Sequence, residues 1–290
     1  PPRSTLFPYT TLFRSAAKRL ESWDQIHQYA RHGWVYRGQR QATWGLETSL
    51  ERFCDRGEIP LGQRRDLESR LCREFRRGYH QYALHVPRNN SMLEWFALMQ
   101  HHGSPTRMLD FTYSIYVAAY FAIEEADNDC ALWAINGVWA LQASVALLKR
   151  AGKAEAEKLE LNWDDGGDTI FDDIVLKEPV ALCATPQNPF RLNERLRIQM
   201  GIFMVPGRMD ASFVDNLEAL PGHERPENVV QITIPLEFRL PALKMLFDMG
   251  ISRRSLFPGL DGYAQSLAVY SPALNPVKWD RQQLDSFDPK

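Results

Sequence analysis

The chain has 290 residues, a formal net charge of −2, 44% hydrophobic residues and 24% charged residues. These proportions are typical of a soluble globular protein. No apolar run approaches the ~20 residues that a membrane helix needs, so we expect no membrane partner. The slight negative charge excludes a protein that is basic throughout, although a local basic groove remains compatible with it.

The four cysteines are far apart in the sequence and form no Cys-x-x-Cys pair. This spacing is unlike that of a zinc site, so we expect no metal bound through them. Unpaired cysteines are typical of a reducing compartment, and the expected location is cytoplasmic.

The first residues do not read like part of a fold. The string TLFPYTTLFRS at 5–15 resembles the in-frame translation of a sequencing adapter. Residues 1–15 are therefore not expected to belong to the fold, and the natural start of the gene is expected to be missing. Residues 16–275 are predicted to form one domain and 276–290 a C-terminal tail. Within the domain, the polar, acidic stretch 150–173 is predicted to be a surface insertion; the alternative is a divalent-ion site on its aspartates.

Hydrophobic periodicity and Gly/Pro breaks give the expected elements. In chain order these are a short helix at 20–30, a strand at 34–38, a helix at 61–84, a helix at 92–100, a buried helix at 112–125, a strand at 131–135, a helix at 141–149, strands at 179–183, 201–205 and 229–234, a helix at 236–249 and a short helix ending near 256–262. Strands interleaved irregularly with helices predict an α+β domain. The arginines of 61–84 are interpreted as a solvated face, with a nucleic-acid contact as the alternative.

A polar block at 101–107 precedes the buried helix and crowds imidazole, guanidinium and hydroxyl groups onto what we expect to be a turn. His101 and His102 are candidates for general acid–base work, and only one of them should face a cleft because neighbours on a helix point ~100° apart. The alternative is a histidine that only stabilises the turn. Arg107 and Asp110 are expected to form an internal ion pair rather than to contact a ligand directly.

Hydroxyls mark the start of the buried helix. One of Thr112 and Ser114 is expected to cap the helix while the other faces the cleft, unless Asp110 is the cap. Further along, Arg197 and Gln199 alternate in what we interpret as a strand, so both side chains should point to the same face.

The segment QHHGSPTRMLDFTYSIYVAAYFA at 100–122 resembles the central signature of the FRG domain. A Phe-Arg-Gly-type triplet of that family corresponds to Tyr36-Arg37-Gly38, followed by Gln39. Segments 195–203 and 256–262 fit in the right order, so the resemblance covers roughly 20–270.

A more distant resemblance joins the same Tyr-Arg-Gly triplet, the Thr112-x-Ser114 element and 199–207 to the motifs of ADP-ribosyltransferases. It implies a mixed or antiparallel sheet core with flanking helices. It also implies that Arg37 binds a phosphate or ribose of NAD, that Gly38 permits close approach, and that the hydroxyls line the nicotinamide pocket. Where those enzymes place a catalytic Glu, this chain has Gly201, so Asp110 or Glu194 would have to supply the carboxylate, or His101 or His102 a base.

These patterns give one set of expectations about function. The candidate catalytic residues are His101, His102, Asp110 and Glu194. The candidate cofactor-binding residues are Arg37, Gly38, Gln39, Thr106, Arg107, Thr112, Ser114, Tyr120, Arg197 and Gln199. The expected cofactor is NAD, without a metal, and the expected activity is ADP-ribosyl transfer or NAD glycohydrolysis.

The expected biological setting is a bacterial or phage effector, toxin or defence protein, with an antitoxin-like protein partner. Two alternatives are a non-catalytic sensor that binds a nucleotide or nucleic acid, and a His/Asp-dependent hydrolase or nuclease.

Overall fold

A computed structural model describes residues 16–83, 87, 91–161, 170–191 and 193–267. The strands are β1 (Ala16–Arg19), β2 (Trp34–Gln39), β3 (Leu109–Thr112), β4 (Cys130–Asn136), β5 (Ala184–Gln187), β6 (Gly201–Pro206) and β7 (Val229–Ile234). The adapter-like residues 1–15, the predicted tail 276–290 and the centre of the predicted insertion lie outside the described residues.

The α-helices are α1 (Ser49–Arg56), α2 (Arg64–Tyr79), α3 (Met92–His101), α4 (Ile115–Ile123), α5 (Gly137–Arg150), α7 (Glu194–Ile198), α8 (Phe213–Glu218), α9 (Arg239–Asp248), α10 (Arg253–Leu256) and α11 (Leu260–Ser266). Short helical turns are η1 (Trp23–Tyr29), η2 (Leu61–Gln63), η3 (Ala156–Leu161), η4 (Asp172–Leu176) and η5 (Leu236–Phe238).

The seven strands form one sheet in the order β1-β7-β4-β2-β3-β6-β5. Only β1 and β7 run parallel, and the other neighbours are antiparallel, so the sheet is mixed. The predicted α+β class with flanking helices is confirmed.

The sheet is nearly divided at its centre. β2 pairs with β4 over six residues, from Trp34 to Gln39, but with β3 only where Tyr36 lies opposite Thr112. Beyond that pair β3 follows β6 instead, from Leu109 to Thr112. Since the two strands stop pairing after one residue, side chains from both can enter the space where they diverge.

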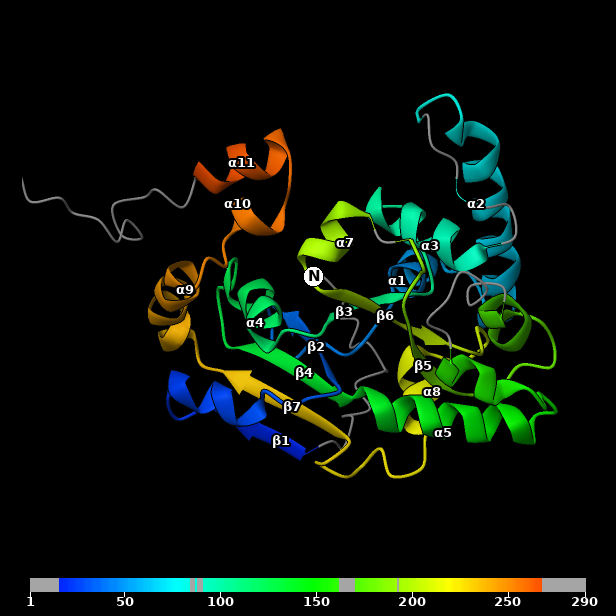
Figure 1. Cartoon of the computed structure of the whole chain (residues 1–290), viewed down its shortest axis with the longest axis horizontal. Helices are drawn as coiled ribbons and strands as arrows, with labels where there is room; N and C mark the ends of the chain where they lie inside the picture. Colours follow the sequence, from blue (N-terminus) through cyan, green and yellow to red (C-terminus); the bar gives the residue numbers. More distant parts are fainter. Residues whose placement is uncertain (1–15, 84–86, 88–90, 162–169, 192, 268–290) are drawn as a thin grey trace, which may run out of the picture.

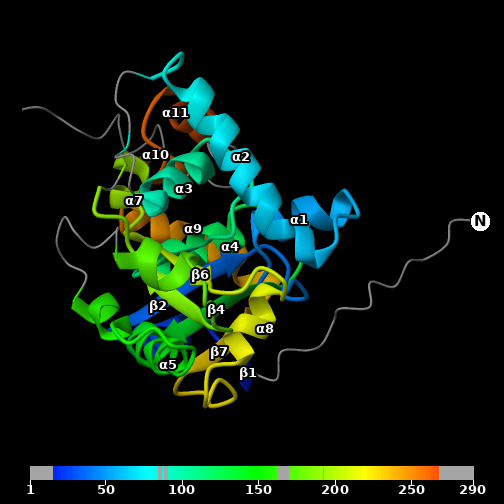
Figure 2. The same ribbon diagram turned by 90° about the vertical axis from the view of Figure 1, so that its right-hand side faces the viewer.

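Helices cover both faces of the sheet and give two cores. One core joins the inner faces of α3, α5 and α8 to β6 and to one side of β2 and β4. The other lies between η1, α4 and α9 and the opposite side of β2, β4 and β7. Figure 1 shows α4 lying over β2 and β4, with α9 beside it, while α2 and α3 stand at the far end. In Figure 2, which is turned by 90°, α2 and α3 again lie side by side.

Local sequence explains several of the helix starts. Ser91, Ser114 and Asn193 each accept a hydrogen bond from a backbone N–H in the first turn of α3, α4 and α7. Such caps satisfy one of the donors that a helix start leaves unpaired. The helix α4 is apolar nearly all round, and it is buried as expected.

Two sequence expectations are wrong, and one strand was not predicted at all. The unpredicted strand is β3 at 109–112, with Asp110 exposed between two buried neighbours. Residues 194–198 form the helix α7 and not a strand, because Asn193 caps a single helical turn. The strand predicted at 179–183 lies at 184–187 instead.

The arginine-rich helix also differs from the expectation in part. It ends at Tyr79, and Tyr82, expected in its apolar stripe, is 87% exposed. Arg64 is buried rather than solvated and donates to Asp55. Within the described residues, none of the helices has both the length and the hydropathy to cross a bilayer.

Candidate functional site

A cavity of about 280 Å³ lies where β2 and β3 diverge. Its walls come from β2, α3, β3, α4, α7 and β6. The charged lining residues are Arg37, Asp110 and Arg195, and the neutral polar ones are Gln100, His101, Thr112, Asn193 and Gln199. The volume is close to the lower end of the range for ligand pockets, roughly 300–1,000 Å³. Segments far apart in sequence therefore supply one cavity with both polar and apolar lining residues.

Arg37 lies near the end of β2 and bridges the gap between the diverging strands. Its Nη1 donates to the main-chain oxygen of Asp110 at 2.8 Å. Its Nε is buried and has no hydrogen-bond partner among the described residues. Burial lowers the pKa of this guanidinium, which the charge of Asp110 partly offsets. A buried donor without an acceptor costs free energy, and a ligand that supplies an acceptor removes that cost.

Thr112 and Gln199 tie β3 to the end of α7. The Thr112 hydroxyl donates to the main-chain oxygen of Gln199 at 2.7 Å and accepts from the backbone N–H of Ser114 at 3.0 Å. The side-chain amide of Gln199 donates to the main-chain oxygen of Leu256 at 3.1 Å. Thus the segments around 37, 112 and 199, which the sequence analysis groups together, do meet in space.

Besides its arginines and Tyr36, the titratable groups that line the cavity are His101 and Asp110. His101 is the last residue of α3, and burial, together with the charges of His102 and Arg195, lowers its pKa. The imidazole is therefore neutral at pH 7 and suited to accept a proton. Asp110 is exposed, so its carboxylate is in contact with solvent as well as with the cavity.

Residues 32–130 match the family model of the FRG domain. The protein contains an FRG domain. The match runs from just before β2 to the start of β4, and the predicted domain boundaries of 16–275 stay a prediction. No curated protein and no solved structure gives a significant match.

The FRG-domain match holds Arg37, His101, Asp110 and Thr112, whereas the α7 wall lies beyond it. Three residues of that wall, Asn193, Arg195 and Leu196, are not among the predicted site residues. The Asn-Glu-Arg-Leu start of a capped helix was the available signal.

Two of the predicted cofactor-binding residues, Gln39 and Thr106, make contacts within the fold. Gln39 is buried, donates to the main-chain oxygen of Gly45 and accepts from Trp133. The hydroxyl of Thr106 donates to the side chain of Gln100. Neither Gln39 nor Thr106 is among the residues that line the cavity.

The expected ion pair between Arg107 and Asp110 is wrong. Arg107 is 4% exposed and forms a buried ion pair with Glu68, 39 residues away. Asp110 points instead to solvent and the cavity. Arg107 therefore holds α2 against the loop after α3 and does not line the cavity.

Ser114 and Tyr120, two predicted cofactor-binding residues at the start of α4 and within it, also make contacts inside the fold. Ser114 is the N-cap of α4, its hydroxyl accepting from Val117. Tyr120 is buried and donates to Glu124 at 2.6 Å, and burial raises the pKa of its phenol. Neither is among the residues that line the cavity.

Gly38 lines the cavity, but its lack of a side chain serves packing. A Cβ there would lie 2.0 Å from the main-chain oxygen of Ala118 and 2.6 Å from the backbone nitrogen of Ala122. The glycine therefore lets α4 approach β2, rather than a ligand as expected. At Gly201, a Cβ would lie 2.2 Å from the Leu196 side chain, so a carboxylate there would require Leu196 to move.

Three further candidates are exposed and lie outside the cavity lining. These are His102, Glu194 and Arg197. The rule that only one of the two adjacent histidines faces the cleft fits the observed geometry. For Arg197, the interpretation as a strand residue beside Gln199 fails because α7 is a helix.

The described part of the chain has no cluster of side chains suited to binding a metal ion. No three His, Cys, Asp or Glu side chains among the described residues are arranged to hold an ion. The four cysteines are all buried and unpaired with one another.

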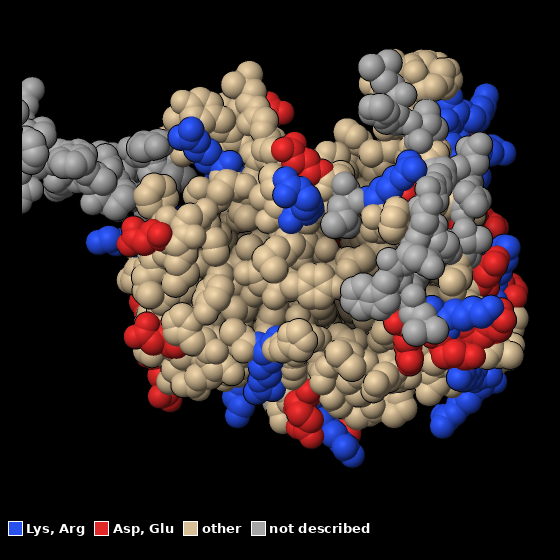
Figure 3. All heavy atoms as spheres, in the orientation of Figure 1, with Lys and Arg blue, Asp and Glu red and all other residues tan. Residues whose placement is uncertain are grey.

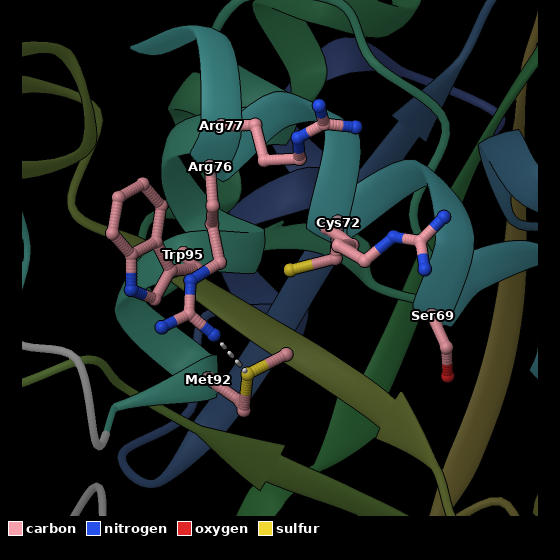
Figure 4. Close-up of a pocket in the computed structure, with 7 residues that line it drawn as sticks. Ser69, Cys72, Arg76, Arg77, Met92 and Trp95 are labelled. Carbon is pink, nitrogen blue, oxygen red and sulfur yellow. Dashed lines mark hydrogen bonds between the residues drawn. The ribbon is translucent and has the colours of Figure 1, made fainter. Parts of the chain in front are cut away.

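A second cavity of about 450 Å³ lies between α2 and α3. Arg76 extends from α2 toward the Met92 sulfur, 3.7 Å away, and lies over the Trp95 ring (Figure 4). Burial raises the pKa of the Cys72 thiol to about 11, so it is a poor nucleophile at neutral pH. All the arginines that line this second cavity come from α2, and Glu74 lies 3.3 Å from Arg73. This cavity has no group suited to acid–base chemistry.

On the face drawn in Figure 3, the charges of the described side chains are mixed rather than concentrated. Figure 3 shows Lys and Arg interspersed with Asp and Glu around the rim of one face, and a centre with few charged side chains. The described side chains on this face form no continuous basic track of the kind that a long nucleic acid binds.

Proposed function

We propose that the cavity between β2 and β3 binds a phosphate-bearing nucleotide, with NAD as the leading candidate. The observation that carries this proposal is Arg37, whose guanidinium is fixed by a carbonyl while its Nε lacks an acceptor among the described residues. A guanidinium fork matches a phosphate in bidentate geometry. The aromatic side chains Phe111, Phe121 and Phe203 also line the cavity and offer apolar surface to a base or a nicotinamide ring.

The ADP-ribosyltransferase-like fold is part of the same proposal. An Arg on a central strand, a hydroxyl on the neighbouring strand and a glutamine before a third strand surround one cavity here. This arrangement supports the likeness that the sequence motifs suggest.

Calorimetric titration with NAD tests this proposal. Wild-type protein should bind, and Arg37→Gln should weaken binding at least about tenfold, since one charge-assisted contact contributes roughly 1.5–3 kcal/mol. The matched control is Arg40→Gln, three residues further on, where the side chain pairs with Glu125 on the surface. Equal affinity in wild type and Arg37→Gln, or no binding by either, contradicts the proposal. Melting temperatures establish that both variants fold.

A second candidate is turnover of NAD in this cavity, favoured by the presence of His101 and Asp110 in the lining. Water adds to the ribosyl carbon as the bond from that carbon to nicotinamide breaks. The bonding electron pair passes to the ring nitrogen of nicotinamide, and the water proton passes to His101. Asp110, in place of the missing carboxylate at Gly201, stabilises the cationic ribosyl group that develops.

Release of nicotinamide from labelled NAD measures that turnover. Asp110→Asn should lower the rate by a factor of ~10² or more while leaving binding within about threefold. The control is Glu194→Gln, a nearby exposed carboxylate outside the lining. Binding without release would instead favour the sensor function, and cleavage of nucleic acid without NAD would favour the hydrolase.

A further inference from the structure

Arg195 is a cavity residue with an unusual set of neighbours. Its Cζ lies 4.6 Å from the centroid of the Phe257 ring. An aromatic face attracts a cation but offers no hydrogen-bond acceptor to its N–H groups. No hydrogen bond or ion pair joins the Arg195 side chain to any other described residue. The side chain is therefore held in place while its donors have no acceptor among the described residues.

Arg253 provides a comparison on the same ring. Its Cζ lies 4.8 Å from the Phe257 centroid, yet its guanidinium also pairs with Glu124 at 2.8 Å. Arg253 is thus neutralised within the fold, whereas Arg195 is not. The segment from α10 to Phe257 positions one arginine for structure and leaves the other facing the cavity.

Arg37 and Arg195 lie near the same carboxylate. Burial lowers the pKa of each guanidinium, and in both cases the charge of Asp110 acts in the opposite direction. The charged lining residues are two arginines and one aspartate, and His101 is neutral at pH 7. The lining therefore carries a net charge of one positive unit, and its two guanidiniums come from different elements.

We infer that the cavity recognises a diphosphate, with one phosphate at Arg37 and the second at Arg195. This inference rests on the proposed nucleotide binding and adds the class of nucleotide. Two guanidiniums from different elements can each contact one phosphate, whereas a monophosphate uses only one of them. Phe257 is then a positioning residue, because it holds Arg195 without occupying its donors.

Titration with ADP and AMP, followed by calorimetry, tests the inference. Wild-type protein should bind ADP about 10- to 100-fold more tightly than AMP, as expected for one additional charge-assisted contact. Arg195→Gln should remove this difference by weakening the binding of ADP while leaving the binding of AMP unchanged. The control Arg197→Gln, on the same helix but exposed and outside the lining, should retain it.

Phe257→Leu is the second variant, since it keeps the charge of Arg195 and removes only its aromatic support. It should reduce the preference for ADP at least about threefold, with AMP affinity unchanged. Equal ADP and AMP affinities in wild type, or an Arg195→Gln variant that keeps the preference, overturn the diphosphate assignment while the role of Arg37 stands. Failure of both nucleotides to bind overturns the proposed function itself, and the inference with it.

Discussion

Glu47 precedes α1 beside two other carboxylates, those of Glu51 and Asp55. Burial, the hydrogen bond with Asp55 and the charge of Glu51 raise its pKa from the usual 4.5 to about 7, although Arg52 acts the other way. Between these two pH values the folded protein holds a proton that the unfolded chain releases. The free energy of unfolding contributed by this group therefore falls as pH rises from about 4.5 to 7.

We predict that Glu47→Gln, which mimics the protonated form, gains stability relative to wild type as pH rises. Urea unfolding at pH 5 and pH 8 measures the difference between the two proteins at each pH. The exposed Glu58→Gln serves as the control for an equivalent carboxylate-to-amide change at the surface. A Glu47→Gln difference that is equal at both pH values would show that Glu47 is not perturbed in the folded state.

Individual side-chain partners were harder to predict than several of the residues that line the cavity. Arg37, His101, Asp110, Thr112 and Gln199 were recognisable because local motifs carry them. The partner of Arg107 was not, because Glu68 lies on a different helix and proximity in sequence pointed to Asp110. Sequence spacing gives neighbours on one element, whereas ion pairs between elements depend on how those elements pack.

At the scale of elements, strong periodic segments were predicted and short ones were not. The strands β2, β4, β6 and β7 and the helices α3 and α4 lie where their patterns place them. By contrast, β3 has four residues with an exposed Asp110, too few to show a period. The helix α7 spans five residues, of which the last four alternate between polar and apolar like those of a strand. As a result Arg195, which depends on α7, was missed.

The contact between α4 and β2 gives a prediction about packing. Gly38→Ala should lower the free energy of unfolding by about 1–3 kcal/mol or more, because its Cβ would meet main-chain atoms of α4 that cannot move independently. Urea unfolding measures the loss.

Gly45→Ala is the matched control for this packing prediction. A Cβ at Gly45 meets nothing within 4 Å, so that variant should stay within about 1 kcal/mol of wild type. If Gly38→Ala were as stable as Gly45→Ala, α4 would not approach β2 as closely as described. Gly38 would then again be a candidate for the close approach of a ligand.

For the molecule as a whole, the site depends on the near-division of the sheet. The FRG-domain match supplies β2, α3, β3 and α4, while α7 and β6 from beyond the match complete the cavity. Asn193, Arg195 and Gln199 all lie in that later part. A polypeptide limited to the matched residues would therefore lack one wall of the cavity and one of its two arginines.

A crystal structure of the protein with ADP is the most direct test of the central claim, that the cavity between β2 and β3 is a nucleotide site. We predict phosphate oxygens within hydrogen-bonding distance of the Arg37 guanidinium, with the second phosphate at Arg195. ADP bound elsewhere, for example among the arginines between α2 and α3, with the cavity free of phosphate, would contradict the account.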